Sequence, residues 1–200
     1  MTVMEITAAM VKKLRDATGA GMMECKGALT EANGDLDAAT TLLRKRGLAQ
    51  AQKKAGRSTS EGLVGHYIHM GGKIGVLVEI NCESDFVART DKFQELTKEI
   101  AMHIAAANPT YVRREDVPVE ILDRERDIYK DQVKDKPAQV IDKIVDGKLN
   151  SYYQQFCLLD QPSVRDQNTT IAQLVQDAIR ILGENITITR FVRMKVGESA

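Results

Sequence analysis

Apolar residues recur every three or four positions through the first fifty residues, and glycines interrupt this pattern at regular points. The pattern predicts three short helices, over residues 7–18, 21–32 and 35–46. Gly19, Gly34 and Gly47 follow their last residues, and glycine adopts the left-handed backbone that ends many helices. Helices of about three turns are marginal in water by themselves. We therefore expect the three to pack together as a small bundle.

The pattern then changes from a helical period to strict alternation. Residues 49–61 are small, polar and basic, which predicts a linker that begins as helix. Apolar residues alternate with polar ones over 64–70 and again over 74–80, and Gly71-Gly72 stands between the two runs. Two alternating runs joined by a pair of glycines are typical of a β-hairpin.

Helical patterns return in the second half of the chain, and one more strand follows them. We expect a long helix over 91–107, two or three helices over 118–156 with breaks at Pro137 and Gly147, a helix over 171–182 and a strand over 186–196. A hairpin, several helices and a final strand predict an α+β fold with a small antiparallel sheet. The predicted organisation is a three-helix bundle over residues 1–48, a linker over 49–61 and an α+β core over 62–200.

Charge and hydropathy narrow the classes of partner. Lysine plus arginine equal aspartate plus glutamate at 28 each, so the whole chain offers no electrostatic attraction to nucleic acid or to an anionic membrane. The chain has no apolar run long enough to cross a bilayer, and the first residues carry no signal-peptide pattern. We therefore expect a cytoplasmic protein that binds another protein or a small ligand.

The cysteines and histidines give no strong indication of a metal or a catalytic site. Cys25, Cys82 and Cys157 lie far apart, form no Cys-x-x-Cys motif and have no histidine at a metal-ligand interval. Reduced thiols are the simplest interpretation. One alternative stays open, in which Cys82 is a nucleophile served by His66 or His69.

Two short motifs are the best candidates for binding residues. Gly19-Ala20-Gly21 predicts a tight corner between two helices, followed by Met22 and Met23. Adjacent helical residues cannot both face inward, so we expect one methionine in the core and the other on the surface, where a flexible thioether suits a partner contact.

The second motif is Ser84-Asp85-Phe86-Val87, between the hairpin and the long helix. On one interpretation Ser84 or Asp85 caps the next helix and Phe86 belongs to the core. On the other, Phe86 sits in a strand-to-helix connection, where rigid scaffolds often carry their binding residues.

Three segments of the chain resemble signatures of the elongation factor Ts family, in the family's order and spacing. They are residues 14–29, residues 78–89 and residues 190–198. Two positions depart from the family pattern: Ser84 stands where threonine is usual, and Ser163 where an aromatic residue is usual. The chain also has one core module, as in short-form members, for which the resemblance implies dimerisation.

The resemblance implies a guanine nucleotide exchange factor that acts on elongation factor Tu, without a cofactor, a bound metal or covalent catalysis. Ser84, Asp85, Phe86 and Val87 would form a wedge that enters the GTPase, displaces its Mg²⁺ and distorts its phosphate site. Leu14, Arg15, Met22 and Met23 would dock the N-terminal bundle, which is ubiquitin-associated-like (UBA-like) in the family. His103 would lie near the GTPase.

A binding module from another class remains as an alternative. In that case the bundle binds a peptide, as ubiquitin-associated domains do, and the core is an unrelated dimeric scaffold. The role of Phe86 separates the two hypotheses, because only an exchange factor needs a wedge.

Overall fold

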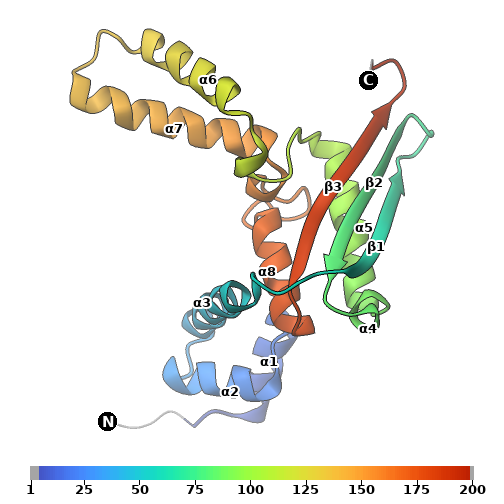
Figure 1. Ribbon diagram of the computed structural model, residues 1–200. Coiled ribbons are helices and arrows are strands. Elements are labelled where there is room, and N and C mark those ends of the chain that lie inside the picture. Colours follow the sequence, from blue (N-terminus) through green and yellow to red (C-terminus); the bar gives the residue numbers. More distant parts are fainter. Residues whose placement is uncertain (1–4, 199–200) are drawn as a thin grey trace. The chain divides into compact units, whose positions relative to one another are not determined.

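The chain combines helices with one small sheet, and a computed structural model describes residues 5–198 (Figure 1). Within these residues there are eight α-helices, two short 3-10 helices and three strands. The sheet has the order β1-β2-β3, and its strands run antiparallel. The predicted α+β class is confirmed.

Three N-terminal helices pack on one another, as predicted. They are α1 (Ala8–Thr18), α2 (Met22–Glu31) and α3 (Leu36–Lys54). Side-chain oxygens cap two of them: Thr7 Oγ1 accepts from Met10 N at 3.3 Å, and Asp35 Oδ1 accepts from Asp37 N and Ala38 N at 2.9 Å each. Their shared core consists of Val11, Leu14, Ala20, Cys25, Ala28, Leu29, Ala39 and Leu43.

The prediction that the third helix ends at Gly47 is wrong, since α3 continues to Lys54. Gly47 is buried, and a Cβ there would lie 3.1 Å from Cδ of Arg180. This glycine therefore serves the close approach of a side chain and does not end the helix.

The sheet consists of β1 (Glu61–Ile68), β2 (Ile74–Cys82) and β3 (Ile186–Lys195). The predicted hairpin joins β1 to β2, and Gly71 and Gly72 take φ values of 86° and 68° in its turn. His69 N donates to Ile74 O at 2.9 Å, which closes the loop. On the other side of β2, Val196 N donates to Lys73 O at 2.9 Å and so adds the C-terminal segment to the sheet.

One face of the sheet packs on a long helix. After the short α4 (Asp85–Ala88), α5 (Asp91–Ala107) carries the fully buried side chains of Phe93, Ile100 and Ile104. A Cβ on Gly65 of β1 would lie only 2.1 Å from Cγ2 of Thr97, so the strand and the helix approach closely at that point.

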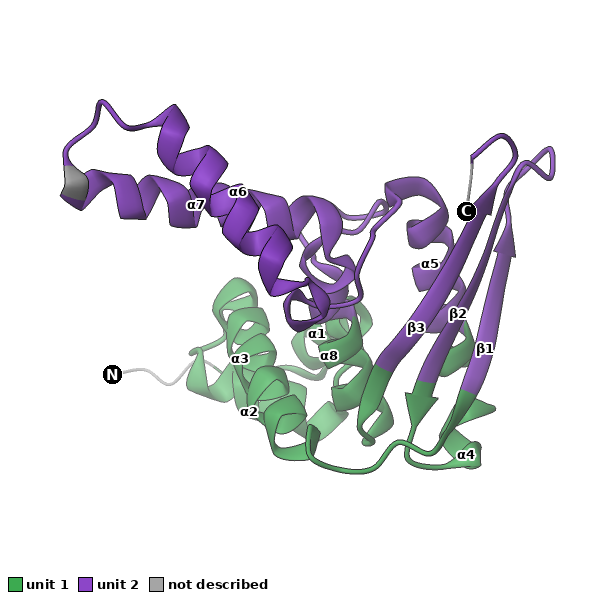
Figure 2. Cartoon of the chain, turned by 45° about the horizontal axis from the view of Figure 1, so that its top comes forward, with its two compact units in different colours: residues 1–62, 81–94, 175–187 green, residues 63–80, 95–174, 188–200 purple. Residues whose placement is uncertain are grey.

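The region after α5 forms a pair of antiparallel helices (Figures 1 and 2). A 3-10 turn, η1 (Arg114–Asp116), leads into α6 (Val119–Gln132), and α7 (Ala138–Phe156) returns. Pro137 ends the connection between them, as predicted. The predicted break at Gly147 is wrong: α7 runs through it, because a solvent-facing glycine weakens a helix by only about 1 kcal/mol. The 3-10 turn η2 (Leu158–Asp160) and α8 (Ile171–Leu182) lead to β3.

The chain divides into two compact units, each assembled from separated segments (Figure 2). Unit 1 contains residues 1–62, 81–94 and 175–187, and unit 2 contains residues 63–80, 95–174 and 188–200. The division predicted from the sequence, at residues 48 and 61, stays a prediction. Residues 1–4 and 199–200, which the prediction assigns to the bundle and the core, lie outside the described part of the chain.

Candidate functional site

The connection from β2 to α4 presents the second motif on a capped helical turn. Ser84 has an extended backbone, with φ −131° and ψ 153°, and its Oγ accepts from Val87 N at 3.4 Å. Ser84 is therefore the N-cap of α4, one of the two residues considered for that role. The hydroxyl that replaces the usual threonine hydroxyl still performs this function.

Phe86 extends into solvent from this turn. Its side chain is 83% exposed, whereas Val87 and Ala88, the next two residues, are buried. The interpretation that places Phe86 in the core is therefore wrong. A phenylalanine held in water by a buried neighbour leaves a large apolar surface free for a partner.

Charged groups flank the exposed ring without covering it. The Asp85 carboxylate and the Arg89 guanidinium form an ion pair at 2.7 Å between Oδ2 and Nη2, and both side chains are more than half exposed. An exposed pair of this kind contributes little to stability. Phe86, Arg89 and Thr90 together border a shallow hollow of about 300 Å³.

The corner between α1 and α2 presents the first motif. Gly19 takes φ 64°, and its amide donates to Arg15 O at 2.7 Å, which ends α1. The Glu24 carboxylate accepts from Gly21 N at 3.1 Å and so supports the first turn of α2. Gly19 has little room for a side chain, since a Cβ there would lie 3.1 Å from Cδ1 of Ile181.

Both methionines at this corner are exposed, Met22 at 56% and Met23 at 78%. The expectation that one of them lies in the core is wrong, because the corner residue Ala20 and the second-turn residue Cys25 occupy that position instead. Two adjacent exposed thioethers offer a partner more adaptable apolar surface than the sequence pattern predicted.

A hollow of about 330 Å³ lies beside the corner, bordered by Arg15, Met22 and Arg180 among others. Arg180 comes from α8, and its Nη2 donates to Thr18 O at 2.7 Å. Sequence reasoning missed Arg180, because it lies in an amphipathic helix with no motif around it. Its buried guanidinium fastens the end of α1 and forms part of the wall of the hollow.

Two of the predicted docking residues are buried. Leu14 is in the bundle core and is 1% exposed, so a partner cannot reach its side chain while α1 is packed in this way. His103 is fully buried, its Nε2 lies 2.9 Å from Gln161 Oε1, and its Nδ1 accepts from Val164 N at 3.3 Å. Both ring nitrogens are thus satisfied inside unit 2.

The loop that surrounds His103 contains the other departure from the family pattern. Ser163 is buried, its amide donates to Thr169 O at 2.8 Å, and its Oγ accepts from Arg165 N at 3.2 Å. The small side chain is used here as a hydrogen-bonding group inside a tight loop.

The predicted site residues other than His103 belong to one unit. Arg15, Met22 and Met23 and the segment 84–87 all belong to unit 1, whereas His103 belongs to unit 2. Unit 1 therefore carries every exposed side chain that the two motifs supply.

The geometry does not favour Cys82 as a nucleophile. Its side chain is buried, and its thiol donates to Ser84 O at 3.1 Å. Burial, with a smaller contribution from the Glu184 carboxylate, raises the pKa of the thiol, which disfavours the reactive thiolate. His69 is occupied elsewhere, since its Nδ1 lies 3.2 Å from the Tyr67 hydroxyl.

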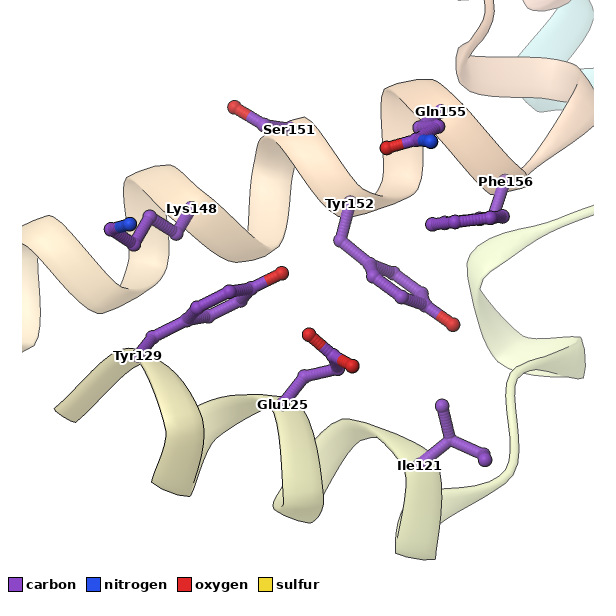
Figure 3. A pocket seen from close by; sticks show the side chains of 8 residues that line it. All are labelled: Ile121, Glu125, Tyr129, Lys148, Ser151, Tyr152, Gln155 and Phe156. Atoms are coloured by element: carbon purple, nitrogen blue, oxygen red, sulfur yellow. The ribbon is translucent and has the colours of Figure 1, made fainter. Parts of the chain in front are cut away.

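A third hollow, of about 710 Å³, lies between α6 and α7 in unit 2 (Figure 3). The rings of Tyr129, Tyr152 and Phe156 line it, and burial together with a hydrogen bond to Glu125 raises the pKa of Tyr129 to about 12. Lys148 lies over the Tyr129 ring at 5.3 Å from its centroid. With one carboxylate and one ammonium group, the hollow has no net charge that would select a charged ligand.

Neither a metal cluster nor a membrane-spanning helix occurs in the part of the chain that the structure describes. No group of three or more histidine, cysteine, aspartate or glutamate side chains there is arranged to hold a metal ion. No helix among those residues is both long and apolar enough to cross a bilayer.

Comparison with known proteins covers nearly the whole chain. Residues 6–198 match the family model described as elongation factor TS. The chain belongs to the elongation factor Ts family. It is 60% identical to elongation factor Ts of Fervidobacterium nodosum, an alignment that covers 98% of this chain and all of that protein. It is 56% identical to that of Solibacter usitatus, covering 98% and 93%, and 54% identical to that of Thermosipho melanesiensis, covering 96% and 100%.

Membership in this family implies a nucleotide exchange factor that acts on elongation factor Tu during translation elongation. Such a factor changes the affinity of a GTPase for its nucleotide. The resemblance on the three quoted segments is thereby confirmed, while the roles of individual site residues stay predictions.

The buried ring of His103 predicts a pH-dependent contribution to stability. Burial lowers the pKa of His103 from 6.5, and the hydrogen bond with Gln161 only partly opposes this. As pH falls, the unfolded chain therefore takes up the proton first. The stabilising contribution is complete above about pH 6.5 and is lost as pH falls below that value toward the folded pKa.

We expect His103→Gln to lower the unfolding free energy by about 1 to 3 kcal/mol at pH 7.5. In urea titrations the difference from wild type should narrow by as much as about 1 kcal/mol at pH 5.5. His66→Gln, at an exposed position, is the matched control and should show a small difference at both values. A pH-independent difference for His103→Gln would contradict the neutral buried ring.

Proposed function

We propose that the chain accelerates GDP release from elongation factor Tu by inserting Phe86 as a wedge that disturbs the Mg²⁺ and phosphate sites of the GTPase. The observation that carries this proposal is the 83% exposure of Phe86 on a helical turn that Ser84 caps and whose next two residues, Val87 and Ala88, are buried. A ring held in this way is already in position, so binding costs little additional ordering.

The physics of nucleotide binding explains why a wedge is sufficient. GTPases hold GDP through backbone amides of the phosphate loop and through a magnesium ion that bridges protein and phosphate oxygens. Displacing the metal or turning one amide away removes much of the affinity. The coupling is reciprocal, so GDP must expel the factor as strongly as the factor expels GDP.

The bundle corner is proposed as the docking platform. Arg15 and Met22 border the same hollow, and Met23 is exposed beside it, so these three side chains can contact the GTPase directly. Leu14 would contribute indirectly, because its buried side chain holds α1 in place in the bundle core. In this proposal the bundle is UBA-like, the factor acts in the cytoplasm and neither a cofactor nor direct contact with nucleic acid is required.

A second copy of the chain is the proposed partner of the uncovered sheet face. Gly75 on β2 lies against Ile68 on β1, and the face of the sheet that carries these two residues points away from α5. The exposed apolar side chains of this face are Val64, Ile68, Leu77, Val192, Met194 and Val196. A patch of this kind is best buried against an identical patch, as in an isologous dimer.

We expect Phe86→Ala to slow factor-stimulated GDP release by about 30- to 150-fold, because it removes about 2 to 3 kcal/mol of apolar burial in the complex. The measurement is stopped-flow release of a fluorescent GDP from elongation factor Tu. Met70→Ala truncates another exposed apolar side chain, 89% exposed in the hairpin loop, and should leave the rate unchanged.

The same experiment separates the wedge from the peptide-binding alternative. Co-sedimentation with nucleotide-free elongation factor Tu measures docking separately. Phe86→Ala should weaken this binding far less than it slows GDP release. Undiminished exchange by Phe86→Ala would leave the bundle as the site of action and contradict the proposed wedge.

The sheet face predicts an equilibrium between dimer and monomer. Leu77→Asp places a carboxylate in the centre of the apolar patch, and we expect it to raise the dimer dissociation constant by about 100-fold or more, because a buried unpaired charge costs several kcal/mol. Sedimentation velocity over a concentration series measures this. Val140→Asp, on α7, is the control and should leave the dimer dissociation constant unchanged. Equal dissociation constants for the two variants, or a wild-type chain that stays monomeric, would exclude this interface.

A further inference from the structure

The carboxylate of Glu184 accepts three hydrogen bonds from the segment that precedes Phe86. Its Oε2 accepts from Glu83 N at 3.1 Å and from Ser84 N at 3.0 Å, and its Oε1 accepts from Ser84 Oγ at 2.6 Å. Glu184 stands between α8 and β3, about 100 residues farther along the chain. Hydrogen bonds to an ionised carboxylate are shorter and stronger than those between neutral groups.

A second set of bonds runs in the opposite direction. Glu83 Oε1 accepts from Asn185 N at 2.6 Å, so each segment supplies a carboxylate to the backbone of the other. The buried Asn185 side chain donates through Nδ2 to Arg57 O at 2.9 Å. We call the mutual pairing of residues 83–84 with 184–185 the carboxylate clasp.

The clasp matters because α4 has little stability of its own. This helix has four residues, whereas isolated helices in water need about 12 to 15 even with favourable sequences. Its N-cap, Ser84, is held by Glu184 on one side while its Oγ accepts from Val87 N on the other. The direction in which Phe86 extends therefore depends on the position of Ser84, and Glu184 fixes that position.

We propose that Glu184 is a positioning residue for exchange, which orients the Phe86 wedge through Ser84 without touching the GTPase. This inference rests on the proposed wedge function. Loss of the carboxylate leaves two backbone amides and one hydroxyl without their acceptor, so the turn adopts several orientations and few of them present the ring correctly.

The test is a double-mutant cycle between Glu184 and Phe86, measured as the maximal rate of GDP release from elongation factor Tu at saturating factor. Glu184→Ala should lower this rate by about tenfold in the wild-type chain, and by less than about twofold in the Phe86→Ala background. A residue that acts through the ring has no further effect once the ring is absent. Tenfold losses in both backgrounds would contradict the positioning role.

A conservative variant keeps the test decisive if Glu184→Ala fails to fold. Glu184→Gln keeps the length and one acceptor oxygen for the backbone amides, so it should recover at least about a third of the maximal rate, with its melting temperature near that of wild type. The concentration of factor at half-maximal rate should change by less than about threefold, because the docking corner is intact.

Glu31→Ala is the matched control. Glu31 is an exposed carboxylate on α2 paired with Arg46, and its removal should leave exchange unchanged. If the wild-type chain does not accelerate GDP release, the proposed function fails. If wild type accelerates, Phe86→Ala does not, and Glu184→Ala equals wild type, only the inference about Glu184 fails.

Discussion

The proposed wedge depends on one constraint: an aromatic ring must be kept in water and still point in a fixed direction. Phe86 cannot be fixed by packing, because it is exposed, so the residues around it must fix the backbone. Val87 and Ala88 turn into the interior on the next two positions, and Ser84 caps the turn from the other side. A helix too short to be stable alone is thereby held by its two ends.

The same separation of tasks is found at the α1–α2 corner. Leu14 and Ala20 are buried and hold the helices together, while Met22 and Met23 remain free. In both motifs, buried residues that build the scaffold lie within a few positions of the residues that are left exposed. A family signature therefore contains both kinds, and only burial distinguishes a contact residue from its support.

Much of the fold could be predicted from the sequence because periodicity is a local property. The hairpin, the long helix and the bundle were all visible in the spacing of apolar residues. Gly47 and Gly147 mislead because glycine has three different roles in this chain. Gly19 ends α1, Gly47 allows Arg180 to approach α3 closely, and Gly147 is tolerated inside α7. Which role a glycine plays depends on tertiary neighbours that a local pattern does not contain.

The site was predicted less completely, for the same reason. The motif around Phe86 was found, but periodicity could not tell its exposure from burial. His103 is predicted only through the family resemblance. It lies inside unit 2, where Gln161 and Val164 form hydrogen bonds with its two ring nitrogens. Glu184 carries no local signal at all, since its partners are about 100 residues away.

In the proposed mechanism, the Phe86 ring moves from water into the GTPase when nucleotide leaves. The chain contains no tryptophan, so Phe86→Trp introduces a single indole reporter at this position. Its emission, taken as the difference from the wild-type complex, should shift to shorter wavelength on binding nucleotide-free elongation factor Tu and return when GDP is added. An emission that stays that of an exposed indole in a complex proven by co-sedimentation would contradict the wedge.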